Sequence, residues 1–229
     1  MSTEYQTDPR NHSMLIRIGG VAVLVGLVIH IVANVFLKEF PPADPSLAEL
    51  RTYLAAEAEA WKIVHGMRYL AVACLALFLA AIFVRTHFAA NAGGWEYVGL
   101  IGGILQLSNL FITNGIETFA FLDFGLQGER PELFWSVFHT TRVLFTAEIV
   151  AWSILIFGFS IAGWRSGKVP KAVATLGYVA SALGLASGVF IGTVMTTGGW
   201  PAMTLEIAAL SSLLWFLCIG VQMSIRGAS

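Results

Sequence analysis

The sequence predicts an all-α membrane protein with six transmembrane helices in a bundle. Of its 229 residues, 57% are hydrophobic and only 12% are charged, and the mean hydropathy is +0.76. Soluble domains carry about twice this charged fraction. Six apolar stretches each reach the roughly 20 residues that a helix needs to cross a bilayer. We expect these helices near 14–37, 61–84, 95–122, 136–163, 171–192 and 202–225, in a single membrane domain over residues 1–229.

The first connection, residues 38–60, is the longest, and we expect it to contain a short helix at the membrane surface. Pro41 and Pro42 end the first helix, because proline cannot continue the hydrogen-bond ladder. Ser46 and Glu49 then match a capping box, which is a typical helix start. Two arrangements are open for the Ala- and Glu-rich segment that follows: a separate surface helix, or an extension of the second transmembrane helix.

The basic residues predict the orientation of the bundle. With the N-terminus inside, seven Lys and Arg residues fall in cytoplasmic segments and only four in the outer loops, which are acidic. The positive-inside rule therefore places both termini in the cytoplasm. Nucleic acid is not an expected partner, because the chain has no long basic stripe. The residues on the cytoplasmic side are Arg10, Arg17, Arg85, Arg165, Lys168, Lys171 and Arg226.

A Trp, a His and an Arg recur at offsets of four and seven in the second and fourth helices. These offsets place the three side chains along one helix face. We interpret the tryptophans as anchors in the aromatic belt of the membrane interface. A histidine and an arginine inside an apolar run cost free energy and need an explanation. The two copies are Trp61, His65 and Arg68, then Trp135, His139 and Arg142.

Polar side chains from five helices should share one layer below the outer surface, if depth is counted at about 1.5 Å per residue. Charged groups are costly in lipid, so they should face the bundle interior and pair. We expect both arginines to reach Glu117 or Glu206, and both histidines to point inward. The layer contains His30, Asn34, His65, Arg68, Asn114, Glu117, His139, Arg142 and Glu206, with Glu148 nearer the midplane.

Several ligands would suit this layer. A small polar or anionic molecule, such as a lipid head group or a quinone, could be held by Arg68 and Arg142 with hydrogen bonds from the imidazoles. Two facing histidines could also ligate a haem iron. His30, His65 and His139 together could bind Zn or Cu. Acid–base chemistry by the His and Glu side chains is possible, but no nucleophile motif or phosphate-binding loop accompanies them. The sequence therefore leaves open whether the protein is an enzyme.

Two other functions remain open for the same residues. The charges could simply fix helix positions in an accessory subunit of a membrane complex. Alternatively, Glu148 could relay protons in proton-coupled solute transport. Carriers usually contain inverted repeats, whereas the two Trp-His-Arg copies run in the same direction. Membrane lipid is the expected partner, and helix–helix contacts are expected at the small-residue repeat of Gly184, Gly188 and Gly192.

The turn after the fourth helix carries a resemblance to a known family. A long apolar helix runs into residues 164–171 (WRSGKVPK), followed by residues 173–177 (VATLG) and another apolar helix. With the long first outer loop, this pattern over residues 14–192 resembles a bacterial family of six-helix membrane proteins, defined only as a domain of unknown function. The resemblance implies the same six-helix layout and a place in the bacterial inner membrane. It implies no activity and no functional residues.

Overall fold

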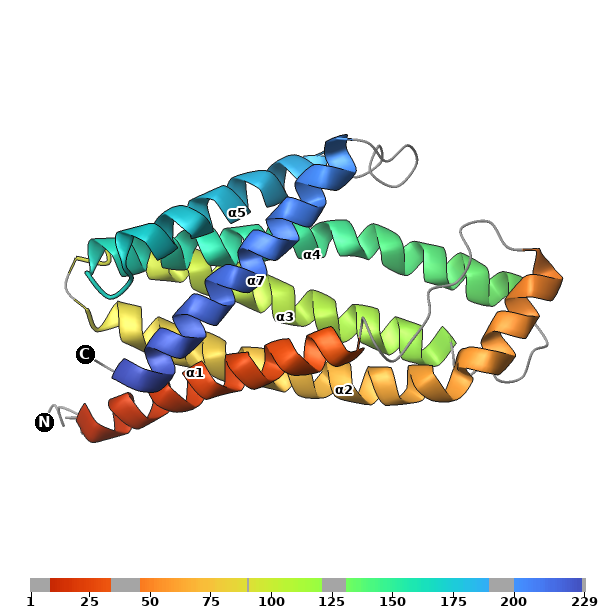
Figure 1. Ribbon diagram of the computed structural model, residues 1–229, viewed down its shortest axis with the longest axis horizontal. Coiled ribbons are helices and arrows are strands. Elements are labelled where there is room, and N and C mark those ends of the chain that lie inside the picture. Colours follow the sequence, from red (N-terminus) through yellow and green to blue (C-terminus); the bar gives the residue numbers. More distant parts are fainter. Residues whose placement is uncertain (1–8, 34–45, 90, 121–130, 190–199, 228–229) are drawn as a thin grey trace, which may run out of the picture.

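The computed structural model describes residues 9–33, 46–89, 91–120, 131–189 and 200–227. Six long helices run back and forth along the long axis of the molecule (Figure 1). Each contains a stretch long and apolar enough to cross a membrane, which confirms the predicted class of multi-pass membrane protein. The helices are α1 (Pro9–Ile31), α2 (Leu47–His87), α3 (Trp95–Phe119), α4 (Pro131–Arg165), α5 (Lys171–Val189) and α7 (Trp200–Arg226).

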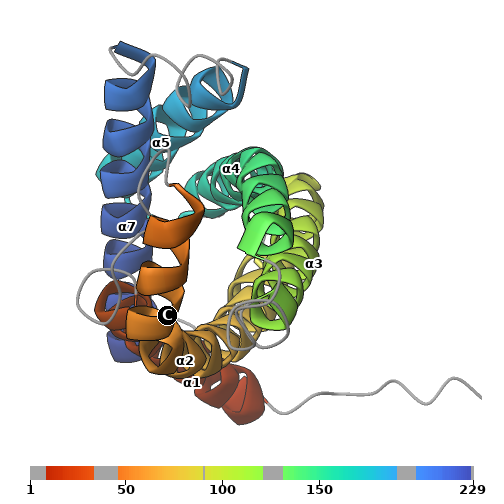
Figure 2. The same ribbon diagram turned by 90° about the vertical axis from the view of Figure 1, so that its right-hand side faces the viewer.

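The six helices form a ring in which each one packs against its neighbours (Figure 2). The last helix, α7, closes the ring because it contacts both α5 and α1. Its first turns lie beside the end of α5, where the hydroxyls of Ser187 and Thr204 are 3.2 Å apart. Its last turns lie beside α1, where a Cβ on Gly20 would be 2.5 Å from the backbone nitrogen of Ser224. Both chain termini therefore lie at one end, the terminal end; we call the opposite end the far end (Figure 1).

The second helix begins at Leu47, fourteen residues before the predicted start at residue 61. The predicted capping box is confirmed: the Ser46 hydroxyl accepts a hydrogen bond from the Glu49 amide at 3.3 Å, and the Ser46 amide donates to the Glu49 carboxylate at 2.8 Å. The capped segment continues into α2 instead of forming a separate surface helix. Figure 1 shows these first turns leaning across the far end toward α4.

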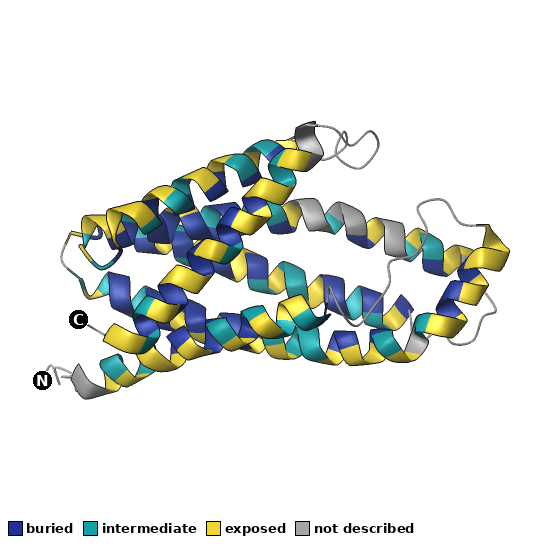
Figure 3. Ribbon diagram, viewed as in Figure 1, coloured by how far each residue is buried: buried dark blue, intermediate teal, exposed yellow. Residues whose placement is uncertain are grey.

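The main apolar core lies toward the terminal end (Figure 3). Its centre is aromatic: Phe78 meets Trp215 and Phe216 edge to face, with ring centroids 6.4 and 5.4 Å away. Glycines bring the helices together around this core. A Cβ on Gly158 of α4 would lie only 2.2 Å from the backbone nitrogen of Gly99 in α3, so neither helix can carry a side chain at this crossing.

The predicted small-residue contacts of α5 are present at two of their three positions. A Cβ on Gly184 would lie 2.3 Å from the Ser153 hydroxyl, and one on Gly188 would lie 2.9 Å from the Val150 side chain. Both neighbours belong to α4, so these glycines serve packing inside the chain. Gly192 lies outside the described residues.

Candidate functional site

The carboxylate of Glu117 is the centre of a polar network that joins three helices. It is buried on α3 and accepts a hydrogen bond from the Arg68 guanidinium on α2. The Thr141 hydroxyl on α4 donates to its other oxygen at 3.3 Å. The Nε2 atom of His65, also on α2, lies 3.5 Å from the oxygen that Arg68 binds. The predicted Arg68–Glu117 ion pair and the inward position of His65, 3% exposed, are thereby confirmed.

Trp61 forms one wall of this network. The guanidinium carbon of Arg68 lies 5.7 Å from the centroid of the indole, which is the geometry of a cation–π contact. The His65 ring lies on the same indole with centroids 5.4 Å apart. The indole nitrogen donates to the Tyr53 hydroxyl at 2.6 Å. The indole thus ties the network to the extension at the start of α2.

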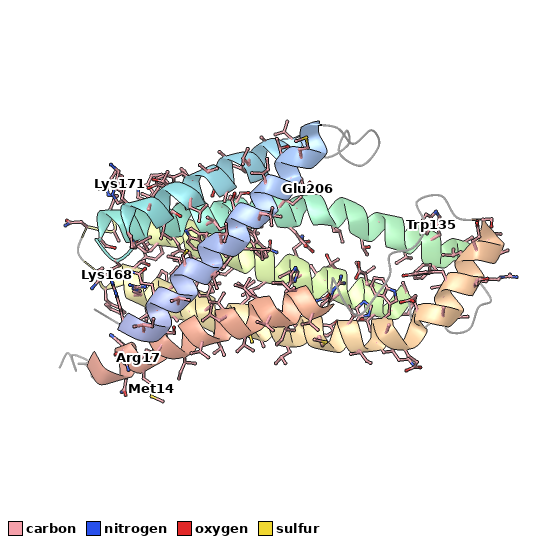
Figure 4. The ribbon with its side chains drawn as sticks, viewed as in Figure 1. Met14, Arg17, Trp135, Lys168, Lys171 and Glu206 are labelled. Carbon is pink, nitrogen blue, oxygen red and sulfur yellow. The ribbon has the colours of Figure 1, made fainter. Side chains whose placement is uncertain are left out.

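The prediction that Trp61 is an interface anchor is wrong, because its side chain is fully buried. The cause is the early start of α2, which puts Trp61 well inside the helix instead of at its end. It packs in a second apolar cluster with Leu50, Leu54 and Phe134. The other predicted anchor, Trp135, packs against the edge of this cluster and lies at the far end (Figure 4).

A second buried carboxyl lies deeper in the same region. Glu148 is on α4, two turns beyond Thr141, and is 9% exposed. Thr113 of α3, Glu117 and Arg68 are close enough to act on its carboxyl electrostatically. The carboxyls of Glu117 and Glu148 thus both lie near Arg68, which carries the one guanidinium among the described side chains of this region.

The remaining predicted residues are placed as follows. Asn114 is buried on α3, one turn before Glu117. His30 is exposed in the last turn of α1. Glu206 is exposed on α7 (Figure 4). The predictions for Asn34, and for the side chains of residues 139 and 142, lie outside the described part of the structure.

Metal or haem binding stays a prediction. Among the described side chains, no group of three His, Cys, Asp or Glu is placed to hold a metal ion. This statement does not cover the side chain of His139, which the three-imidazole hypothesis requires. His65 itself is oriented by Trp61 and Glu117, and a carboxylate beside an imidazole is also the usual way to orient a metal-binding histidine.

Sequence analysis missed two members of the network, Thr141 and Tyr53. Thr141 lies between His139 and Arg142, so the repeated motif already marked its helix turn. Tyr53 precedes Trp61 by eight residues, which is close to two turns of a helix. Extending the helical periodicity of α2 back to the capping box would have placed Tyr53 on the same face.

The fold and this network define a multi-pass α-helical membrane protein with a buried His65–Arg68–Glu117 cluster. Comparisons with protein-family models, with curated proteins and with solved structures each found no match. The resemblance to the bacterial six-helix family is therefore supported only by the six candidate membrane spans.

Proposed function

We propose that this protein binds a small polar ligand at the network around Glu117. The observation that carries the proposal is the convergence of side chains from α2 and α4 on one buried carboxylate of α3. A charged network inside a membrane bundle is costly and usually marks a functional site. If a ligand replaced one of the side chains that contact Glu117, the three helices would move relative to one another.

The competing function is positioning alone. A buried ion pair stabilises a fold little compared with apolar residues of the same size, because both charges lose their hydration. Helix positioning would therefore be served as well by an apolar contact. The second carboxyl, Glu148, adds burial cost without its own cation among the described side chains. A second buried carboxyl close to the first favours a site that exchanges protons or hydrogen bonds over a contact that only positions helices.

The pairing of Arg68 narrows the chemistry of the ligand. Because Glu117 already occupies its guanidinium, an anionic ligand would have to compete with a carboxylate at this position. A neutral molecule with carbonyl or hydroxyl groups needs only a hydrogen bond, which the His65 imidazole can supply. A quinone head group fits this description, and the polar part of a lipid is the next candidate. Further ligand contacts are proposed from Asn114, Glu148, His139, Arg142, His30, Asn34 and Glu206.

The location of the site follows from the proposed orientation. We place the termini in the cytoplasm of a bacterium and the far end at the outer face of its inner membrane. The excess of Lys and Arg in the segments at the terminal end supports this orientation. The network would then be reached from the outer leaflet.

The first experiment is a ligand titration of the purified full-length chain in detergent. A ubiquinone with one isoprene unit is added, and the melting temperature is measured for the wild type, for Glu117→Gln and for Lys62→Gln. Lys62 is the matched control, because it forms an exposed ion pair with Glu59 on the same helix. A hundredfold excess over Kd stabilises a binding protein by about 2.7 kcal/mol. We expect the wild type and Lys62→Gln to gain several degrees, and Glu117→Gln to gain none.

The visible spectrum and the metal content of the same sample separate the other ligand classes. A Soret band would assign haem, and stoichiometric Zn or Cu would assign a metal site. A featureless spectrum, no bound metal and equal melting temperatures with and without quinone or added lipid would contradict ligand binding. The network would then be a positioning device, as in an accessory subunit.

Proton-coupled transport is a second candidate, favoured by the position of Glu148. Its carboxyl is buried within electrostatic range of Glu117, so the two could pass a proton toward the midplane. Vesicles containing the protein and an internal pH dye test this function. Proton uptake driven by a membrane potential should disappear in Glu148→Gln. Equal rates in the wild type, in the variant and in empty vesicles would exclude it.

A further inference from the structure

A groove at the terminal end of the bundle is separate from the network around Glu117. It has a volume of about 530 Å³ and opens on the surface between α3, α4 and α5. Its walls are mostly aromatic: the Phe157 ring meets Trp95 and Tyr178 edge to face, with centroids 5.8 and 6.0 Å away. Trp164 and Phe157 are partly exposed, at 49% and 38%. The groove is lined by Trp95, Phe157, Ile161, Trp164, Arg165 and Tyr178.

Arg165 supplies the one charged group of this lining. Its guanidinium lies against the backbone of Gly93, where an added Cβ would be 3.4 Å from the guanidinium carbon. Gly93 has φ of +71°, a conformation that side chains disfavour. The guanidinium therefore packs against the loop before α3 at the edge of the groove.

The surroundings of the groove are positively charged. No Asp or Glu occurs between Glu148 and Glu206, whereas this segment contains Arg165, Lys168 and Lys171. Figure 4 shows Lys168 and Lys171 at the terminal end, near the turn between α4 and α5. On the α3 side, the carboxyl of Glu96 is turned inward: the residue is 5% exposed and lies 3.4 Å from His87.

We infer that this groove binds an anionic phospholipid, with an acyl chain between the aromatic side chains and the phosphate at Arg165. The candidate membrane spans of α4 and α5 end at Arg165 and begin at Lys171, which places the groove at the level of the lipid head groups. Tryptophan and tyrosine favour this depth. Basic pockets between transmembrane helices are typical sites for anionic head groups. The inference is independent of the function proposed for the Glu117 network.

Tryptophan quenching by brominated lipids tests the inference. The full chain is reconstituted in phosphatidylcholine vesicles that contain brominated phosphatidylglycerol or, in a second set, the same mole fraction of brominated phosphatidylcholine. The chain has seven tryptophans, so the double variant Trp95→Phe/Trp164→Phe is measured in parallel. The difference in fluorescence between the wild type and this variant comes from Trp95 and Trp164, and we call it the groove signal. We expect the groove signal to be quenched more strongly by the anionic lipid.

Two variants separate the head-group contact from the acyl-chain contact. Arg165→Gln should lower the preference for phosphatidylglycerol by about fivefold, the effect expected for one basic side chain near the membrane surface. Ile161→Phe should narrow the groove and reduce quenching by both lipids, while the basic residues stay and no further tryptophan is added. Arg17→Gln is the control, since Arg17 is an exposed basic residue at the same end on α1.

Three results would overturn the inference. The first is equal quenching by the two brominated lipids. The second is an unchanged preference in Arg165→Gln together with unchanged quenching in Ile161→Phe. The third is a groove signal that is not quenched by either brominated lipid but changes with protein concentration. A second copy of the chain would then occupy the groove.

Discussion

The two ends of the bundle are held together by different interactions. At the terminal end, aromatic rings interlock and glycines let helix backbones touch, as at Gly158 and Gly99. At the far end, side chains of three helices meet on the carboxylate of Glu117. Lipid tails are as apolar as leucine, so transmembrane helices associate through close packing or through buried polar contacts. The far end also contains the smaller apolar cluster around Trp61, but among the described side chains only this cluster has a buried ion pair joined to it.

Polar groups also occur at the terminal end: His87 lies 3.4 Å from the buried carboxyl of Glu96, and two other side chains bond to the backbone. The side chains of Arg85 and Gln222 both donate to the carbonyl of Lys168, at 2.9 and 2.8 Å. This carbonyl belongs to the turn between α4 and α5, so the two bonds fasten a helix connection. The far end differs because side chains from two other helices, α2 and α4, contact the carboxylate of Glu117 on α3.

The largest effect is expected from breaking the far-end ion pair on one side only. Arg68→Leu removes the guanidinium from the buried Glu117 carboxylate and should lower the free energy of unfolding by about 3–5 kcal/mol. The double variant Arg68→Leu/Glu117→Leu should recover most of this loss, because neither charge then remains. Denaturant unfolding in detergent micelles measures the cycle.

The matched control for this cycle is Lys62→Gln. Lys62 and Glu59 pair on the surface of the same helix, with 40% and 80% of their side chains exposed. Exposed pairs contribute little, so the change should stay within about 0.5 kcal/mol. Additive losses in the double variant at Arg68 and Glu117 would contradict the account of the network as one coupled unit.

At the terminal end, Gly158→Ala should cost about 2 kcal/mol. The new methyl group would meet the backbone of Gly99, which cannot move aside like a flexible side chain. Gly66→Ala is the comparison, since a Cβ added there would have no atom within 4 Å and alanine stabilises a helix by about 0.5–1 kcal/mol over glycine. If both substitutions gave the same melting temperature, close backbone contact would not be what holds this end.

Tyr53→Phe probes the contact between the α2 extension and the network. The Trp61 indole loses the hydroxyl that accepts its hydrogen bond, and both side chains are buried. We expect a loss of about 1–2 kcal/mol in unfolding experiments. The comparison variant is Tyr97→Phe, at a ring that is 48% exposed, and it should be nearly neutral. Equal stability of the two variants would mean that this bond does not anchor the extension.

The smallest effect concerns the capping box at the start of α2. Hydrogen bonds from Ser46, first from its side chain and then from its backbone, hold the pKa of Glu49 below its usual range. The folded state therefore favours the carboxylate, and its contribution is present above the ordinary pKa of glutamate and lost as the pH falls through the lowered value. Amide-exchange protection in the first turn of α2 should decrease in acid.

Glu49→Gln supplies the test of that pH dependence. Glutamine can still accept the bonds from Ser46 but does not titrate, so protection in this variant should vary less with pH than in the wild type. A wild type whose first turn keeps full protection in strong acid, well below the ordinary pKa of glutamate, would contradict the assigned role of the carboxylate.

Much of the architecture could be predicted from composition and spacing. The six spans, the capping box at Ser46, the close glycine contacts of α5 and the pairing of Arg68 with an acid of the polar layer all follow from apolar run length, helical offsets and the cost of burying charge. Each of these rules applies within one helix, or requires only that a buried charged group pair with a group of opposite charge. The burial of Trp61 could not be predicted in this way, because it depends on where α2 starts and on what the extension covers.

The chain alone thus predicts which segments can span a membrane, because a helix needs about 20 predominantly apolar residues to cross the hydrocarbon core. Which acid pairs with Arg68 is decided by the arrangement of the helices. Contact between α2, α3 and α4 selects Glu117 as the acceptor for Arg68, while Glu206 is exposed on α7. The groove at Arg165 has the same origin, because its walls come from three helices whose mutual distances no single segment encodes.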